Sequence, residues 1–321
     1  MPAALMWSLI FVASITVLIV ASNAFIKAAE KIGVAFGIPT FIIGVTIVAA
    51  GTSLPELVSS IIAVASGSPE IVIGNVVGSN ISNIFLILGF VAVFSRVIRI
   101  DYEIINVDLP LLIGSAFMLS IFVMDGHFSF FEAVLSIISL IVYLVYALNV
   151  ETSIVNVNDE IKHLEEEHPK ATVKTWLMLL LGGFFIYLSA DYTVNSIIEL
   201  SAIFEIGEEV IALTAVSLGT SLPELAVSIA AARKGNPDMA VGNILGSNIF
   251  NSFAVMGIPR LFGPLVIPAH VIDFSIPMMI AASLLYFFIA QNKLISRWEG
   301  FMLLIFYAYF IGQIFVNELA L

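Results

Sequence analysis

Two identical six-residue segments, each ending in a glutamate, are the part of this sequence best suited to chemistry. GTSLPE occupies Gly51–Glu56 and again Gly219–Glu224, so the second copy follows the first at an offset of 168 residues. A longer pair keeps the same offset, with GNVVGSNISN at Gly74–Asn83 and GNILGSNIFN at Gly242–Asn251. Both glutamates fall within long apolar stretches. A carboxylate inside the membrane is energetically costly, so its presence there indicates a function. The repeat therefore predicts two buried acids that act together on a cation.

The residues around the first glutamate can offer several kinds of oxygen to a cation. Thr52 and Ser53 precede Glu56 by four and three residues, so the three side chains can share one face of a helix. Pro55 has no N–H, so the carbonyl of Gly51 loses its helical partner, and we expect the helix to be broken there. The second copy repeats the same set in Thr220, Ser221, Pro223 and Glu224. Each copy thus offers carboxylate, hydroxyl and carbonyl oxygens.

The longer repeated segments add neutral oxygen ligands at helical spacing. Each carries a serine and an asparagine four residues apart: Ser79 with Asn83, and Ser247 with Asn251. This set of oxygens suits Ca²⁺ or Na⁺, and neither motif contains the His or Cys ligands that zinc and copper prefer. Two glutamates carry two negative charges, which one Ca²⁺, several Na⁺ ions or two protons could neutralise. Competition for this charge pair would couple the movement of one ion to that of another.

The composition is that of a membrane protein. Of the 321 residues, 60% are hydrophobic and only 11% are charged, against roughly 25% charged in soluble domains, and the mean hydropathy is +1.09. The net charge is −12, but several acids cluster at 151–167, and no basic stripe predicts a nucleic-acid partner. The absence of cysteine excludes disulfides and thiolate metal sites. The first apolar run lacks a basic n-region, so we expect a retained helix and not a signal peptide.

Ten apolar runs of membrane-spanning length follow one another along the chain. They are expected at about 4–28, 39–65, 70–94, 104–124, 128–149, 174–199, 207–232, 238–260, 268–290 and 296–317. The joints between them alternate in charge, because Arg260 alone of the twelve Lys and Arg residues lies on an even-numbered joint. Positive residues concentrate in the cytoplasm, which places the odd-numbered joints inside and both termini outside. The sequence thus predicts an all-α membrane protein with ten transmembrane helices.

Each repeat holds five spans, an odd number, so the second half must enter the membrane from the opposite side. The expected architecture is two inverted-topology five-helix repeats, residues 1–150 and 174–321, joined by a cytoplasmic linker at 151–173. Inverted repeats around a midplane site are typical of secondary transporters. No Walker motif is present, so we expect an ion gradient to supply the energy, with no enzymatic activity and no cofactor.

With these motifs, the chain resembles the cation/Ca²⁺ exchanger superfamily, and within it the Na⁺/Ca²⁺ exchanger branch. The GTSLPE segments and their longer partners look like the α-repeats of that family, and the likeness covers the whole length. The resemblance implies that Ca²⁺ and Na⁺ are exchanged across the plasma membrane by alternating access. It also implies that the helices at 4–28 and 174–199 slide past a rigid core. We expect no obligatory protein partner beyond the lipid bilayer.

The resemblance also assigns roles to particular residues. Ca²⁺ would lie between Glu56 and Glu224, with the backbone carbonyls of Thr52 and Thr220 completing its site. Na⁺ would be held around that position by four serines: Ser53, Ser79, Ser221 and Ser247. The rest of the implied set is the backbone carbonyls of Ala49 and Ser217 and the amides of Asn83 and Asn251.

Some positions depart from the pattern of particular relatives. Asn251 is an aspartate in some members, including K⁺-dependent exchangers, so the amide disfavours K⁺ coupling. Ser217 replaces a small apolar residue, a mild change if only its carbonyl is used. Proton-coupled relatives usually carry a GNxxE-type motif where this chain has Ser79-Asn80 and Ser247-Asn248, which favours Na⁺ coupling.

Three other functions remain open at the level of sequence. A proton/Ca²⁺ exchanger could be built on the same scaffold. An intramembrane enzyme could use the two acids for hydrolysis, although it would need a nucleophile–base pair or a metal. A cation channel would need a continuous pore, and inverted halves around one charge pair fit occlusion of an ion better.

Overall fold

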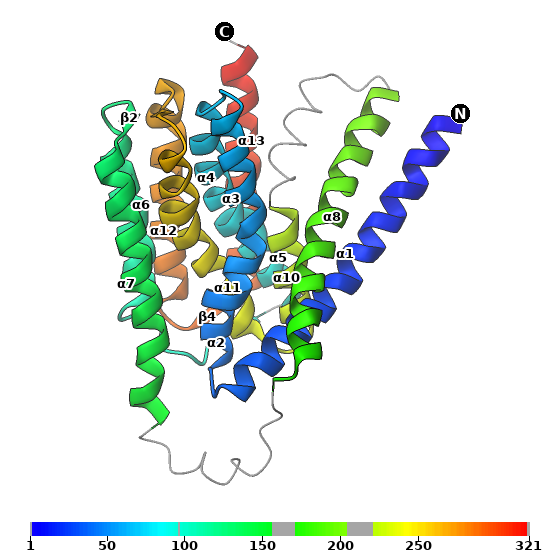
Figure 1. Ribbon diagram of the computed structural model, residues 1–321, viewed down its shortest axis with the longest axis vertical. Coiled ribbons are helices and arrows are strands. Elements are labelled where there is room, and N and C mark those ends of the chain that lie inside the picture. The colour runs from blue at the N-terminus through cyan, green and yellow to red at the C-terminus, as the bar shows by residue number, and fades with distance from the viewer. Residues whose placement is uncertain (1, 96, 156–170, 204–220, 320–321) are drawn as a thin grey trace.

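A computed structural model describes the chain except for residues 1, 96, 156–170, 204–220 and 320–321 (Figure 1). The described part is almost entirely helical. Its α-helices are α1 (Pro2–Ala35), α2 (Thr40–Ile43), α3 (Ala49–Ala65), α4 (Glu70–Ser82), α5 (Gly89–Ser95), α6 (Asp108–Val123), α7 (Phe130–Val155), α8 (Val173–Ile203), α10 (Leu222–Arg233), α11 (Pro237–Phe250), α12 (Ile276–Ala290) and α13 (Arg297–Leu319). Short π-helical turns are η1 (Gly44–Val48), η2 (Asn83–Leu88), η4 (Asn251–Val255) and η6 (Val271–Ser275), and η5 (Pro259–Leu261) is a 3₁₀ turn.

The described residues include seven helical stretches long and apolar enough to cross a membrane. These are Ala3–Ala35, Thr40–Ala65, Glu70–Ser95, Phe130–Ala147, Val173–Leu200, Pro237–Leu261 and Val271–Ala290. The remaining three predicted spans correspond to the shorter α6, to α10 with residues outside the described part, and to α13. The expectation of a helical membrane protein is confirmed, while the count of ten spans stays a prediction.

Two of these stretches form the centre of the molecule. In the most apolar part of Glu70–Ser95, 83% of the residues are buried, and in that of Pro237–Leu261, 89% are buried. In the corresponding part of α1 only 11% of the residues are buried. Both carry the longer repeated segments, whose small residues allow close helix packing. At Gly242 and Gly246 an added Cβ would overlap the carbonyl oxygens of Phe41 and Val45, so α11 lies directly against the backbone of α2 and η1.

Helices α1 and α8 form a separate layer beside this core (Figure 1). They run in opposite directions, because Thr193 in the second half of α8 donates to the hydroxyl of Ser14 in the first half of α1, at 2.8 Å. Towards the other end of the pair, Gly182 leaves room for Phe25. These two contacts are related by the 168-residue offset, since Ser14 corresponds to Gly182 and Phe25 to Thr193.

Two very short antiparallel sheets join the halves of the chain, one at each end of the molecule (Figure 1). Strand β1 (Val97–Arg99) pairs with β4 (Leu294–Ser296), and β2 (His127–Phe128) pairs with β3 (Leu265–Val266). In the pair Val97↔Ser296, adding 168 to Val97 gives Leu265 and subtracting 168 from Ser296 gives Phe128, and Phe128↔Leu265 is the register observed in the second sheet. The repeat in sequence is therefore matched by a repeat in strand pairing.

Candidate ion-binding site

The two repeated glutamates lie in the interior, on helices from different halves of the chain. Glu56 lies on α3 and Glu224 in the first turn of α10, and each side chain is only 1% exposed. Thr52, Ser53 and Ser221 beside them are buried as well. The helical spacing of the motif therefore brings its hydroxyls and its carboxylate to one buried face, as expected from the sequence.

The expected break in the first motif is not found, because α3 continues through Pro55 from Ala49 to Ala65. Proline removes a single N–H donor, and here that loss bends no described residue out of the helix. The irregular backbone comes one turn earlier, in the π-helical turn Gly44–Val48. In the second motif α10 begins at Leu222, with Ser221 as its N-cap residue and Pro223 in its first turn.

Hydrogen bonds between the halves bring the two motifs together. The hydroxyl of Ser53 donates to Oε1 of Glu224 at 3.2 Å. The hydroxyl of Thr52 donates to Oδ1 of Asn243 at 3.2 Å and lies 3.3 Å from the carbonyl oxygen of Ala49. The first GTSLPE copy is thus bound to the second copy and to the partner segment on α11.

Two asparagines that were not among the predicted site residues position the motif helices. The amide of Asn75 donates to the hydroxyl of Ser60 at 3.1 Å, and the amide of Asn243 donates to Ser228 at 2.9 Å. Asn75 also donates to the backbone carbonyl of Glu56 at 3.4 Å. Both asparagines and both serines are identical residues at the 168 offset. The asparagines are the second residues of the longer repeated segments, so the repeat itself was the signal that could have found them.

The serines and asparagines of the longer segments are also buried near this contact. Ser79 lies on α4 and Ser247 on α11, while Asn83 and Asn251 each begin a π-helical turn, η2 and η4. Ser79 donates to Oδ1 of Asn75 at 3.5 Å. Turns of this kind are frequent at functional sites, and here they repeat at the same offset as the motifs. The residues Thr220 and Ser217 of the predicted set lie outside the described part of the chain.

Several buried oxygen atoms of these residues have no hydrogen-bond partner among the described residues. These atoms are both carboxylate oxygens of Glu56, Oε2 of Glu224, the hydroxyl oxygens of Ser221 and Ser247, and the amide oxygens of Asn83 and Asn251. An unpaired buried polar group is costly, and a cation is a partner that satisfies several such oxygens at once. The two carboxylates are close enough to interact electrostatically, so a positive charge between them would relieve their repulsion.

The donor set fits a hard cation. All the unpartnered oxygens come from carboxylate, hydroxyl and amide groups, which suit Ca²⁺ and Na⁺. Within the described residues no three His, Cys, Asp or Glu side chains gather into a cluster, so the charge of the site comes from the glutamate pair. Two negative charges with neutral oxygens around them match one divalent cation or more than one monovalent cation.

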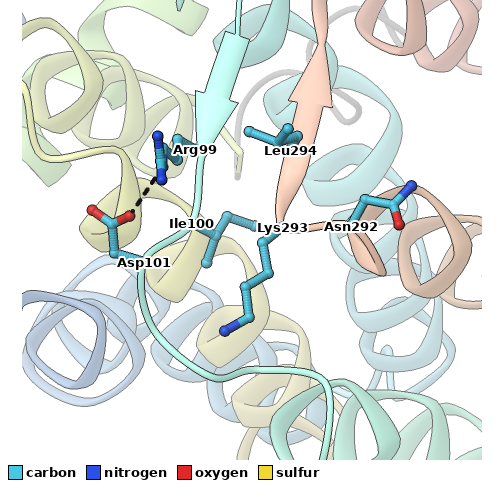
Figure 2. A pocket seen from close by; sticks show the side chains of 6 residues that line it. All are labelled: Arg99, Ile100, Asp101, Asn292, Lys293 and Leu294. Atoms are coloured by element: carbon cyan, nitrogen blue, oxygen red, sulfur yellow. Dashed lines mark ion pairs between the residues drawn. The ribbon is translucent and has the colours of Figure 1, made fainter.

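A hollow of about 440 Å³ lies at the β1–β4 sheet and is lined by none of these residues (Figure 2). Its lining carries Arg99 paired with Asp101 at 3.4 Å and Lys293, which pairs with Glu103 at 2.6 Å. The hydrogen bond and charge of Lys293 hold the pKa of the Glu103 carboxyl below its usual value. Opposite charges here neutralise each other at the surface, so this hollow is a joint between connecting segments and not a cation site.

A multispanning helical protein with a buried carboxylate pair among neutral oxygens belongs to the class of membrane ion transporters. A family model described as sodium/calcium exchanger protein matches residues 6–149 and 174–316. The chain belongs to this family, and it is a prokaryotic-type member of the cation/Ca²⁺ exchanger superfamily. It is therefore a transmembrane antiporter for cations that include Ca²⁺.

Curated relatives and solved structures agree with this assignment over nearly the whole chain. The sodium/calcium exchanger MaX1 of Methanosarcina acetivorans is 33% identical, covering 96% of this chain and 98% of its own length. The inner membrane protein YrbG of Escherichia coli is 30% identical over 85% of each chain. A structure of the sodium-calcium exchanger NCX_Mj soaked with Na⁺ and Sr²⁺ superposes with a TM-score of 0.81 at 30% identity, covering 96% of this chain and 99% of that one.

Proposed function

We propose that this protein exchanges Na⁺ for Ca²⁺ by alternating access, with the two ions competing for a midplane site built on Glu56 and Glu224. The observation that carries the proposal is the buried glutamate pair with unpartnered carboxylate oxygens, one acid from each half of the chain. Uncompensated carboxylates in a low-dielectric interior are strongly disfavoured. The pair must therefore be neutralised in every state that crosses the membrane, and one Ca²⁺ or several Na⁺ ions do so.

The surrounding oxygens complete the proposed site. Ser53, Ser79, Ser221 and Ser247 are its hydroxyl ligands, and Asn83 and Asn251 its amide ligands. Backbone carbonyls of Thr52, Thr220, Ala49 and Ser217 are the remaining ligands of the proposal. Its support is the burial of every described member of this set and the hydrogen bonds that join α3 to α10 and α11.

We propose ten transmembrane helices in two inverted repeats, residues 1–150 and 174–321, with 151–173 as a cytoplasmic linker and both termini extracellular. The sheet that contains β2 and the sheet that contains β4 lie at opposite ends of the molecule (Figure 1). Since β2 and β4 correspond at the 168 offset, this arrangement supports an inversion of one half relative to the other. The start of α1 and the end of α13 lie at the same end, as an even number of spans requires (Figure 1).

In this mechanism the layer of α1 and α8 moves against the buried core and exposes the site to one side at a time. The two helices contact each other extensively and form a layer of their own (Figure 1). The core segments, in contrast, are fixed to each other by the close backbone contacts at Gly242 and Gly246. Transport requires no enzymatic step and no cofactor, and the proposed location is the plasma membrane.

The experiment that tests this function is uptake of radioactive Ca²⁺ into liposomes that contain the purified protein. An outward Na⁺ gradient is expected to drive uptake, and a protonophore is expected to leave that uptake unchanged. Uptake driven by a pH gradient without Na⁺ would instead establish the proton/Ca²⁺ exchanger, in which Glu56 and Glu224 carry protons. Absence of uptake under both gradients would refute Ca²⁺ as the substrate.

A further inference from the structure

An apolar groove follows the line where α1 and α8 meet on the surface of the protein. Its volume is about 600 Å³, and its floor and walls include Val20 and Ala24 of α1 and Leu177, Leu181 and Phe185 of α8. Two polar residues line it, Thr16 and Lys174. The hydroxyl of Thr16 is already used, because it donates to the backbone carbonyl of Val12 at 2.7 Å. The groove therefore offers apolar surface along its length and a single charge.

Positive charges gather at the end of the groove that contains Lys174. On α1 the groove face passes through Val17, Val20 and Ala24, and the same helical spacing continues to Lys27 and Lys31. Both of these lysines and Lys174 are exposed. One acid, Glu30, lies on the same turns of α1, and its carboxylate accepts a hydrogen bond from the amide of Asn236 at 2.5 Å.

The last turns of α1 lie beside the first turn of α8, so the three lysines belong to one end of the helix pair. The rings of Phe36 and Trp176 meet edge to face there, with centroids 6.5 Å apart. Aromatic side chains of this kind are enriched at the boundary between hydrocarbon and water, and lysines extend towards the headgroups. This end of the groove therefore marks a membrane interface.

The length of the groove matches one leaflet of a bilayer. From Lys174 to Phe185 is eleven residues, or about 16 Å at the helical rise of 1.5 Å per residue. Half of a hydrocarbon core of about 30 Å is about 15 Å. A molecule that fills the groove would thus have an apolar chain reaching from the interface to the midplane and an anionic group at the interface.

We propose that this groove binds one acyl chain of an anionic phospholipid, with the headgroup phosphate held by Lys31 and Lys174. Basic residues at a membrane surface attract anionic lipids, and the apolar groove adds a fixed place for the chain. Bound in this way, the lipid contacts both α1 and α8 and stabilises their pairing. The inference concerns lipid binding and does not depend on which ions the protein exchanges.

Native mass spectrometry of the purified full-length protein tests the headgroup part of this proposal. Phosphatidylglycerol and phosphatidylcholine with the same acyl chains are added separately, and bound lipid is counted. The protein is expected to bind one phosphatidylglycerol at least tenfold more tightly than phosphatidylcholine. The double variant Lys31→Ala with Lys174→Ala should lose this preference, whereas Arg297→Ala, which removes an exposed cation at the start of α13, should retain it.

A groove-filling variant tests the acyl-chain part. Ala24→Trp is expected to lower binding of both lipids at least tenfold, while Leu180→Trp, at an exposed position of α8 outside the groove, should leave binding unchanged. Equal binding of the two lipids by the unmodified protein, or a preference that survives the lysine changes, would overturn the proposal. Unaltered binding in a folded Ala24→Trp protein would show that only surface charge attracts the lipid. If Ala24→Trp fails to fold, the lysine variants, which change only exposed side chains, still test whether the site prefers an anionic headgroup.

Discussion

The hydroxyl of Ser53 donates a hydrogen bond to Oε1 of Glu224 across 3.2 Å and so joins α3 to α10. The donor belongs to the first GTSLPE copy and the acceptor to the second. Both groups are buried, so the bond is not exchanged for water as it would be on the surface. One copy of the motif is therefore completed by the other, and the site exists only where the two halves of the chain meet.

Glu56→Gln and Glu224→Gln are each expected to abolish Ca²⁺ uptake. Either change leaves the other carboxylate without its counterpart around a divalent ion. Breaking a buried charge interaction costs about 3 kcal/mol or more, which corresponds to a loss of about 100-fold or greater in affinity. Uptake of radioactive Ca²⁺ into liposomes, driven by a saturating outward Na⁺ gradient, measures this loss. Glu70→Gln, an exposed acid on α4, is the matched control, and full exchange in a folded Glu56→Gln protein would refute the site.

Asn251→Asp is expected to make Ca²⁺ uptake dependent on K⁺. The change places a third negative charge at the start of η4, beside oxygens that have no partner among the described residues. An additional monovalent cation would neutralise that charge. Uptake assayed with and without K⁺ checks this result. Asn195→Asp on α8, where the native amide already contacts Asp191, is the surface control, and K⁺-independent uptake by Asn251→Asp would contradict the role given to this position.

Asn243→Ala is expected to lower stability by about 1–3 kcal/mol, because it leaves buried hydrogen-bonding groups unpaired. Asn243 accepts from Thr52 and donates to Ser228, so the change also frees α3 from α11. Affinity for Ca²⁺ should fall together with the melting temperature. Asn75→Ala should act in the same direction through Ser60. Thermal unfolding and uptake kinetics measure both effects, and a response no larger than that of Asn195→Ala would disprove the positioning role.

Gly242→Ala is expected to destabilise the core by about 1–3 kcal/mol, since overpacking forces backbone shifts. The added methyl would overlap the carbonyl oxygen of Phe41, which belongs to α2 and cannot rotate away. Gly114→Ala on α6 is the matched control, because a Cβ there meets no atom within 4 Å. That control should stabilise the helix by about 0.5–1 kcal/mol. Opposite shifts in unfolding temperature are the expected result, and equal shifts would contradict the close-packing account.

Glu103→Gln is expected to lower stability at neutral pH by less than about 1 kcal/mol, the usual contribution of an exposed ion pair. Lys293 lowers the pKa of Glu103 in the folded protein, so the stabilisation is present above the unfolded value of 4.5. It is lost as the pH falls through the lower folded value. Thermal unfolding across pH should show the two proteins converging in acid. A difference that grows in acid would contradict the assigned sign.

The sequence was sufficient to predict the helical membrane class and the buried position of the glutamates. Glu56 and Glu224 lie in identical motifs within apolar stretches. A carboxylate there is costly in contact with lipid, so both side chains were expected in the protein interior. Helical spacing also predicted correctly that Ser53 lies on the same side as Glu56. Direct contact of Ser53 with Glu224 could not be predicted, since it depends on how α3 and α10 pack.

Other features left little trace in the sequence pattern. Strands of two or three residues are too short for a period-two pattern, so β1 to β4 were not expected. The π-helical turns at Asn83 and Asn251 arise from packing in the core and have no composition of their own. The expected break at Pro55 was wrong because one missing donor does not end a helix that is packed on several sides.

The two small sheets have a consequence for how the chain could be divided. Each sheet takes one strand from the first half and one from the second, in the same register at the 168 offset. If the chain were cut in the linker and the halves were separated, each of the four strands would lose its partner strand. An unpaired strand can form backbone hydrogen bonds with a strand of another chain, and the strand of matching register lies in the other half. Halves produced separately are therefore expected to form these sheets only when the two halves associate.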